Sequence, residues 1–384
     1  MNRSIFLNDL FPKAMEFSTL TIILTDRCNF CCSYCYQNKK NRQLDIATIT
    51  RAMDFFYPRL TRECFINFYG GEPLLAFNRL DETVAYLESL NRRGKLKIHY
   101  SLSTNGSLLN EDILRFLHKH AFSLVLSFDG WAQEICREKG SFDRIVSLIP
   151  EIIKRRRISL ETNSVFTPKT IGHLAASIRL LLLLGVPKIH AGVSYRMRWN
   201  PASLKRLKKE IATVRNSFLD AYERMGDIPW VEMAEANKKG VYRCDAGREQ
   251  MALSADGKLW GCFLFPHYFD GKNGKGRGEK YCFGRVDAFL RDPEAIYVRT
   301  MSAIAGLGMD SARTPLKECV LCGDIESCWI CPIAAAFSSR AVGTISLQAC
   351  RLARMMREER DLFSRGFEDK KRKRNPTIKA AGFS

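Results

Sequence analysis

The sequence has no apolar run long enough to cross a membrane and no targeting signal at its N-terminus. Its longest apolar run, Ile178–Val186, is interrupted by Arg179 and is far shorter than the roughly 20 residues that a spanning helix needs. Residues Met1–Glu16 mix charged and apolar side chains, without the apolar stretch of a signal peptide. Both absences count against a membrane or secreted protein, and they predict a cytoplasmic location.

Acidic residues are few relative to basic ones. The chain has 41 Asp and Glu against 60 Lys and Arg, a net charge of +19. One interpretation is a surface that binds an acidic partner, such as an acidic peptide or RNA. The other is a solvated basic surface with a basic tail, Lys370–Arg374. No nucleic-acid motif accompanies the charge, so we favour the second interpretation and expect no nucleic-acid partner.

Cysteine is abundant, and its clustering indicates metal binding. The chain has fourteen cysteines, and a cytoplasmic protein keeps its thiols reduced. Four of them follow the apolar run Leu20–Leu24 within eight residues, at positions 28, 31, 32 and 35. Three thiolates on a four-iron cluster leave one iron open for a small molecule, whereas four thiolates make an electron carrier only. The third ligand beside Cys28 and Cys35 is either Cys31 or Cys32, and a zinc knuckle is the alternative to a cluster.

Residues 19–194 alternate strand-like and helix-like stretches. The strand-like runs are Thr19–Leu24, Cys64–Phe68, Leu96–Leu102, Phe122–Phe128, Ile158–Val165 and Lys188–Val193. The helix-like stretches are Asp45–Tyr57, Asn78–Arg93, Glu111–Lys119, Phe142–Arg155 and Thr170–Leu184. This alternation predicts an α/β fold with a parallel sheet, a partial (β/α)6 version of the TIM barrel. Chemistry in such folds collects at the C-terminal ends of the strands, where the four clustered cysteines lie.

Polar and glycine residues also follow the next three strands. Gly70, Gly71 and Glu72 follow the second strand, and the adjacent glycines let backbone approach a ligand closely. The third strand is followed by the run Ser103–Gly106 and the fourth by Ser127–Gly130. Each run alone is typical of an ordinary turn. Because all of them follow strands, we expect them to converge on one rim of the barrel.

These motifs together resemble the radical S-adenosylmethionine (SAM) enzymes. The spacing of Cys28, Cys32 and Cys35, with Tyr34 before the last, resembles the family's CxxxCxxC signature. The resemblance implies that these three cysteines hold a SAM-binding [4Fe-4S] cluster and that Cys31 does not. It also implies that SAM is bound by Tyr34, Gly70, Gly71, Glu72, Ser103, Asn105, Ser127, Asp129 and Arg137. Arg137 lies either near the SAM carboxylate or in an ordinary surface ion pair.

A second group of cysteines lies in the C-terminal half. Its members are Cys244, Cys262, Cys282, Cys319, Cys322, Cys328, Cys331 and Cys350. The Cys-x2-Cys pairs among them also suit a zinc ribbon. The group resembles the SPASM extension, which holds two auxiliary four-iron clusters. The resemblance assigns Cys319, Cys322, Cys328 and Cys350 to an outer cluster. It assigns Cys244, Cys262 and Cys331 to an inner one, with Cys282 either its fourth ligand or uninvolved.

The expected organisation has five parts. They are an N-terminal segment (1–18), a radical SAM core (19–198), a bridging helical segment (199–240), a SPASM-like auxiliary cluster domain (241–355) and a basic, disordered tail (356–384). About eighteen residues precede the first strand, so we expect no N-terminal leader-binding domain.

The resemblance implies an oxidoreductase of the peptide-modifying maturase type. Such an enzyme cleaves SAM reductively and uses the 5′-deoxyadenosyl radical to modify a ribosomally made peptide or protein by a cross-link, thioether or other oxidation. The expected partners are that substrate, which is acidic under one interpretation of the charge, and an electron donor such as flavodoxin or ferredoxin. A sulfatase-type formylglycine maturase is the alternative, although Phe263 stands where we expect an aspartate in that branch. A non-enzymatic iron–sulfur electron carrier is the other alternative.

Overall fold

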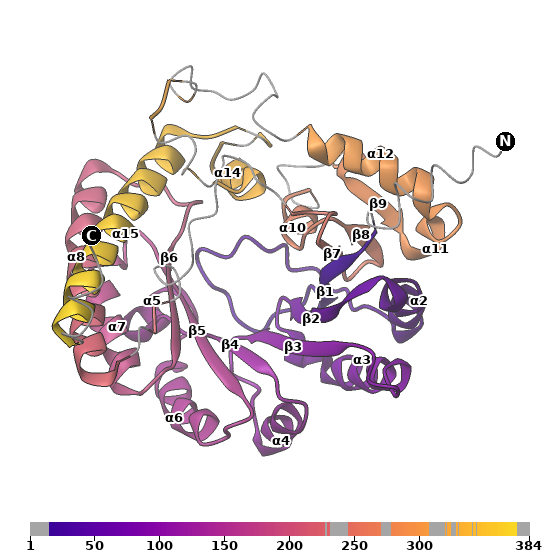
Figure 1. Ribbon diagram of the computed structural model, residues 1–384, viewed down its shortest axis with the longest axis horizontal. Coiled ribbons are helices and arrows are strands. Elements are labelled where there is room, and N and C mark those ends of the chain that lie inside the picture. The colour runs from indigo at the N-terminus through magenta and orange to yellow at the C-terminus, as the bar shows by residue number, and fades with distance from the viewer. Residues whose placement is uncertain are drawn as a thin grey trace, which may run out of the picture.

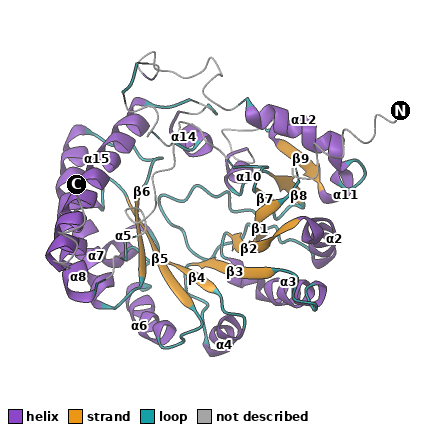
Figure 2. Cartoon of the chain, in the orientation of Figure 1, coloured by secondary structure: helices purple, strands orange, loops and turns teal. Residues whose placement is uncertain are grey.

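The chain folds around one curved sheet with helices on its outer side (Figures 1 and 2). The computed structural model describes residues 15–226, 229–230, 245–269, 278–306, 319, 321–323, 328, 330–339, 341–342 and 344–374. The predicted segment 1–18 therefore lies largely outside the described residues. No helix in these ranges is both long and apolar enough to span a bilayer.

The sheet is built from nine strands in the order β6-β5-β4-β3-β2-β1-β7-β8-β9. Their bounds are β1 (Phe17–Thr25), β2 (Leu60–Gly70), β3 (Lys97–Thr104), β4 (Ser123–Ser127), β5 (Ser159–Phe166), β6 (Lys188–Val193), β7 (Gln250–Leu253), β8 (Lys258–Trp260) and β9 (Cys282–Arg285). Strands β1 to β6 are parallel, each beside the next in sequence. Because parallel strands need crossover connections, helices fill the intervals between them. The predicted partial (β/α)6 barrel is confirmed.

The helices cover the outer face of this sheet. Those of the barrel are α2 (Ile46–Phe56), α3 (Phe77–Leu90), α4 (Glu111–Lys119), α5 (Gln133–Cys136), α6 (Phe142–Ile153), α7 (Leu174–Leu183) and α8 (Pro201–Met225). Short polar side chains start several of them, as capping requires. Asp45 accepts a hydrogen bond from Thr48 N–H at the start of α2 (2.8 Å), and Asn200 accepts one from Ser203 N–H at the start of α8 (2.8 Å).

The main core lies between the strands and these helices. Alternate residues of β2, including Cys64, Ile66 and Phe68, are fully or almost fully buried there. The intervening residues, such as Tyr69, point to the opposite face because side chains alternate along a strand. The apolar face of the sheet therefore packs against the outer helices, and the inner face of the barrel is left for polar groups.

The C-terminal half continues the same sheet. Strand β7 pairs parallel with β1, placing Leu253 opposite Ile22, and β7 pairs antiparallel with β8. The remaining helices are α10 (Leu264–Phe269), α11 (Val286–Phe289), α12 (Pro293–Ala305), α14 (Pro332–Ser339) and α15 (Leu347–Arg374). Helices α10 and α14 lie side by side over the open end of the barrel (Figure 1).

The prediction of a disordered tail from residue 356 is wrong as far as Arg374. Helix α15 runs through that residue and packs against α8 (Figure 1). Phe363 is 2% exposed and its ring meets that of Trp230 at 5.6 Å. Glu359, equally buried, forms an ion pair with Arg215 at 2.5 Å. The sequence carried the signal, because Leu352, Phe363 and Phe367 recur at helical spacing. Residues 375–384 lie outside the described residues.

Candidate active site

A cavity of about 290 Å³ lies at the C-terminal ends of the barrel strands. Its wall includes the loop after β1, with Cys28, Cys32 and Cys35. The ends of β2 to β6 supply the rest of this side of the wall, as the rule for such barrels predicts. The predicted residues that line it are Cys28, Cys32, Tyr34, Cys35, Gly70, Gly71, Ser103, Asn105, Ser127 and Arg137.

The cysteine loop has an inner and an outer side. Cys28, Cys32 and Cys35 line the cavity, whereas Cys31 is exposed and does not. The Cys31 thiol lies 3.7 Å from Lys39 Nζ, and its backbone N–H donates to Glu138. This geometry supports Cys32 over Cys31 as the third ligand.

Burial changes the protonation of the cavity thiols. It raises the pKa of Cys28, and it raises the pKa of Cys32 to about 11. Neighbouring Cys35 adds to both rises, since two thiolates close together repel. The protein alone therefore favours thiols at neutral pH, and a bound cation would be needed to hold thiolates.

The glycine pair presses the loop after β2 against the loop after β1. Gly71 N–H donates to Thr25 O and Glu72 N–H donates to Arg27 O, both at 2.8 Å. A Cβ atom on Gly71 would lie 2.2 Å from Arg27 O, and one on Gly70 would lie 2.5 Å from Thr25 O. Only glycine permits this contact, which leaves both glycines on the cavity wall.

Glu72 lies behind the wall and does not line the cavity. Its carboxylate is fully buried and accepts from Thr104 Oγ1 (2.7 Å), Asn105 N–H (2.7 Å) and Leu74 N–H (3.1 Å). Burial raises the pKa of Glu72 to about 7, although these hydrogen bonds oppose the rise. Glu72 thus joins the end of β2 to the end of β3 and supports the wall that they form.

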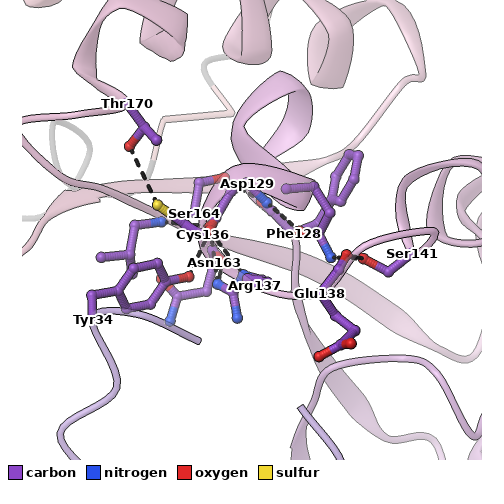
Figure 3. A network of polar contacts seen from close by, with 12 residues as sticks. Tyr34, Phe128, Asp129, Cys136, Arg137, Glu138, Ser141, Asn163, Ser164 and Thr170 are labelled. Atoms are coloured by element: carbon purple, nitrogen blue, oxygen red, sulfur yellow. Dashed lines mark hydrogen bonds and ion pairs between the residues drawn. The ribbon is translucent and has the colours of Figure 1, made fainter. Parts of the chain in front are cut away.

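Asp129 plays a similar part for Tyr34 and Arg137 (Figure 3). It is fully buried and accepts from Tyr34 Oη (2.6 Å), Val165 N–H (2.8 Å) and Arg137 Nη2 (3.0 Å), while Arg137 Nε lies 2.9 Å from Oδ2. Burial alone would lower the pKa of Arg137, but Asp129 outweighs it and the pKa is raised. Asp129 does not line the cavity, whereas Tyr34 and Arg137 do. The ion pair is therefore internal, not on the surface.

Further residues of the wall were not predicted. Asn163 and Val165 come from β5 and Val193 from β6, and the strand-end rule that found Ser103 and Ser127 applies to them equally. Tyr36 and Tyr69 also line the cavity, and their hydroxyls lie 2.6 Å apart. Leu264, Ala334 and Phe337 close it from α10 and α14. No sequence signal links those two helices to the barrel.

The proposed outer cysteines gather at one place. Burial raises the pKa of Cys328, and Cys350, Cys319 and Cys322 are all close enough to raise it further. Cys328 and Cys350 pack against one small apolar cluster of Ile330, Ala335, Ile345 and Ala349. This grouping supports the predicted outer ligand set.

The proposed inner set is only partly described. Cys244 lies outside the described residues. Cys262 precedes α10 and Cys331 precedes α14, and these helices contact each other. Cys282 lies on β9 opposite Trp260, and its Sγ accepts from Gly284 N–H at 3.3 Å. The arrangement supports Cys262 and Cys331 as neighbours and leaves the role of Cys282 open.

The three cavity thiols can serve as cluster ligands. Among the residues that the structure describes, no three Cys, His, Asp or Glu side chains lie close enough to hold one metal ion. Zinc needs its ligands gathered within bonding distance of one point. The three cavity thiols instead surround a space that continues into the glycine and polar wall. They fit a four-iron cluster with one open iron, and the rest of the wall fits the polar groups of SAM.

Comparison with known proteins supports this assignment. The family model "Radical SAM superfamily" matches residues 22–181. The radical SAM cyclopropyl synthase TigE of Paramaledivibacter caminithermalis is 26% identical over 290 residues, 67% of this chain and 60% of TigE. A cysteine-type anaerobic sulfatase-maturating enzyme of Clostridium perfringens is 30% identical over 162 residues, 38% of this chain and 43% of that protein. The chain thus spans less than two thirds of these relatives.

A solved structure has the same fold over nearly the whole chain. Native anSMEcpe with bound AdoMet and Kp18Cys peptide superposes with a TM-score of 0.72 at 16% identity. The match covers 92% of this chain and 99% of that one. It therefore extends beyond the barrel into the C-terminal half.

Proposed function

Because residues 22–181 are a radical SAM domain, we propose that this chain cleaves SAM reductively and modifies a ribosomally made peptide or protein. The observation that carries the proposal is the single cavity in which three cysteine thiols face a glycine and polar wall. Such a wall would hold SAM against a cluster bound by the three cysteines. When bound, the cluster and SAM supply an electron and a 5′-deoxyadenosyl radical that abstracts hydrogen from the target.

The protein's own residues position and shield these groups. Cys28, Cys32 and Cys35 would hold the cluster, and the backbone of Gly70 and Gly71 would approach SAM. Arg137 would face the SAM carboxylate, with Asp129 fixing its orientation and neutralising its buried charge. Ser103, Asn105 and Ser127 offer hydrogen-bonding groups on the same wall. The apolar residues from α10 and α14 would exclude water.

A peptide or protein target is supported by the structural neighbour. That protein, which has the same fold, was solved with AdoMet and the Kp18Cys peptide bound. The open end of our cavity is bounded by the C-terminal half, in a position to cover an extended target. The reaction would also need a one-electron donor, such as flavodoxin or ferredoxin. Reduced thiolate ligands support a cytoplasmic location.

The C-terminal half would hold two auxiliary clusters. Cys319, Cys322, Cys328 and Cys350 group around one site, and Cys262 and Cys331 begin two touching helices. Such clusters would offer a route for the electron left on the target after hydrogen abstraction. We retain the division into a core (19–198), a bridge (199–240) and an auxiliary domain (241–355) as part of this proposal, with α15 extending the fold to Arg374.

Sulfatase maturation is the alternative, and the C. perfringens relative favours it. Two features of this chain count against it. Phe263 follows Cys262 where we expect an aspartate, and its ring meets that of Tyr69 at 5.0 Å. None of the described residues lining the cavity is Asp, Glu or His. A target hydroxyl or thiol would find no carboxylate or imidazole there to accept its proton.

Two single substitutions test the function. The protein is reconstituted anaerobically, and 5′-deoxyadenosine is measured after adding SAM and dithionite. Cys32→Ala should abolish the product, because the open iron would be lost with the cluster. Cys31→Ala, the adjacent control, should retain it. Retained activity in Cys32→Ala with loss in Cys31→Ala would contradict the ligand assignment, and no product from the wild type would contradict the function.

A further inference from the structure

We infer that the cavity has a second half that accepts an uncharged, apolar side chain of the target. This half is lined by Tyr36, Tyr69, Val193, Leu264, Ala334 and Phe337. The inference rests on the proposed function and specifies the chemical class of the residue that is modified.

The two halves of the cavity differ in chemistry. The half described above has the cysteines, the glycine pair, and polar groups from β3, β4 and β5. The six residues of the second half carry two aromatic hydroxyls and otherwise carbon, and the polar residues Gln37, Ser194 and Tyr195 also line the cavity. Its apolar residues come from the end of β6 and from helices α10 and α14. An apolar wall gains free energy by covering apolar surface, and it penalises any group that must lose its water there.

Charged groups are almost absent from the wall. Among the described residues that line the cavity, the charged side chains are Arg137 and Arg196. Asp129 neutralises Arg137. Arg196 is exposed at the mouth, donates to Cys35 O, and lies over the Phe337 ring at 5.8 Å. Arg196 therefore leaves a positive charge beside the second half, and no acidic side chain is among the described residues that line the cavity. An ammonium group on the target would be buried there without a counter-charge, whereas a carboxylate could pair only with Arg196 at the exposed edge.

Hydrogen bonding in the second half is also limited. The Tyr36 and Tyr69 hydroxyls bond each other at 2.6 Å, and Tyr69 makes a further hydrogen bond with Gln37. Because the two hydroxyls bond each other, the pair can present one hydroxyl to a backbone amide of the target. The pair alone cannot satisfy a side chain with several polar atoms.

The second half also lies between the two cysteine regions. Cys35 and Cys262 are both near enough to Tyr36 to add to the rise in its pKa. A side chain held against Tyr36 would thus lie between the proposed SAM-binding cluster and the proposed inner site. This position suits hydrogen abstraction from an unactivated carbon, which an aliphatic side chain provides. The positive charge of the chain would then act on acidic residues of the target outside the cavity.

Binding selection tests the inference without requiring catalysis. Reconstituted holoenzyme with saturating SAM and no reductant is used to select from a displayed library of random twelve-residue peptides. The affinity of the best peptide and its point variants is then measured by fluorescence anisotropy. We expect an aliphatic or aromatic residue at one fixed position. Replacing it by Lys should weaken binding by at least about 100-fold, because the ammonium group would be buried unpaired.

Two enzyme variants locate the site. Leu264→Ala should weaken binding of the selected peptide by about tenfold, as expected for methyl groups lost from an apolar pocket. Phe337→Glu should shift selection toward Lys or Arg at the same position. Leu183→Ala, a change at a residue 85% exposed on α7, is the matched control and should alter neither. Retained SAM binding by equilibrium dialysis shows that a variant is folded.

The outcomes separate the two proposals. Selection of Ser, Cys, Asp or Glu at the fixed position, or no preference at all, would overturn the inference even if the wild type forms 5′-deoxyadenosine. Apolar selection that Leu264→Ala and Phe337→Glu leave unchanged would also overturn it. Absence of 5′-deoxyadenosine with reductant would instead overturn the proposed function, because peptide selection does not depend on SAM cleavage.

Discussion

Replacing Asp129 by Asn should destabilise the fold strongly despite the similar shape of the two side chains. The carboxylate is fully buried and receives four contacts of 2.6 to 3.0 Å from Tyr34, Val165 and Arg137. An amide keeps one acceptor oxygen, so its NH2 group must face one of these donors. It also leaves Arg137, whose side chain is 7% exposed, without its counter-charge. Removing one partner of a buried ion pair costs about 3–5 kcal/mol.

The assay is thermal unfolding of the apoprotein, which separates this effect from cofactor binding. A loss of that size should lower Tm by roughly 4–6 °C in a chain of 384 residues. The double variant Asp129→Asn/Arg137→Met removes both charges and should be more stable than Asp129→Asn alone. Tyr34→Phe, which removes one hydrogen bond, should cost only about 1 kcal/mol. A Tm change below about 2 °C for Asp129→Asn, or a double variant with simply additive losses, would refute this reasoning.

Three further predictions concern the wall around the cavity. Burial raises the pKa of Glu72 from 4.5 in the unfolded chain to about 7 in the folded protein. The contribution of Glu72 to the free energy of unfolding is therefore full below pH 4.5 and is lost as the pH rises through about 7. The difference in the free energy of unfolding between the wild type and Glu72→Gln, measured with urea, should therefore change by about 3 kcal/mol between pH 4.5 and 8. A difference that stays constant with pH would exclude this pKa. Gly71→Ala should abolish SAM binding in equilibrium dialysis, because the added Cβ would lie 2.2 Å from Arg27 O. The control Gly323→Ala should bind SAM normally, since no atom lies within 4 Å of its added Cβ. Equal SAM binding by the two variants would show that the loops after β1 and β2 can separate. Iron loading of the apoprotein should rise steeply with pH, because the Cys32 thiol has a pKa of about 11 and must lose its proton to bind iron. Iron loading that does not change from pH 6.5 to 8.5 would contradict that protonation state.

The barrel was predictable because its signals are local. Each strand-like run is short and apolar, and the first five are each followed by an amphipathic stretch. The six strands were therefore predicted in the right places, and Lys188–Val193 was predicted with the bounds observed. The strand-end rule likewise placed Ser103 and Ser127 on the cavity wall. Both inferences need only the pattern within about ten residues and the geometry of parallel sheets.

The parts that escaped prediction depend on contacts between distant segments. The sequence does not show that β7 pairs with β1, nor that Phe337 and Leu264 reach the cavity. It also does not show which residues each buried carboxylate bonds. Glu72 and Asp129 are predicted to bind the cofactor, which stays a prediction, and in the structure each accepts hydrogen bonds from residues that line the cavity.

Counting iron per chain tests the central claim most directly. The wild type and the Cys28/Cys32/Cys35→Ala variant would be reconstituted anaerobically, and iron and sulfide measured in each. Three four-iron clusters predict roughly 12 irons in the wild type and roughly 8 in the variant. Equal iron in the two proteins would contradict the claim that these three cysteines hold a cluster beside the SAM-binding wall.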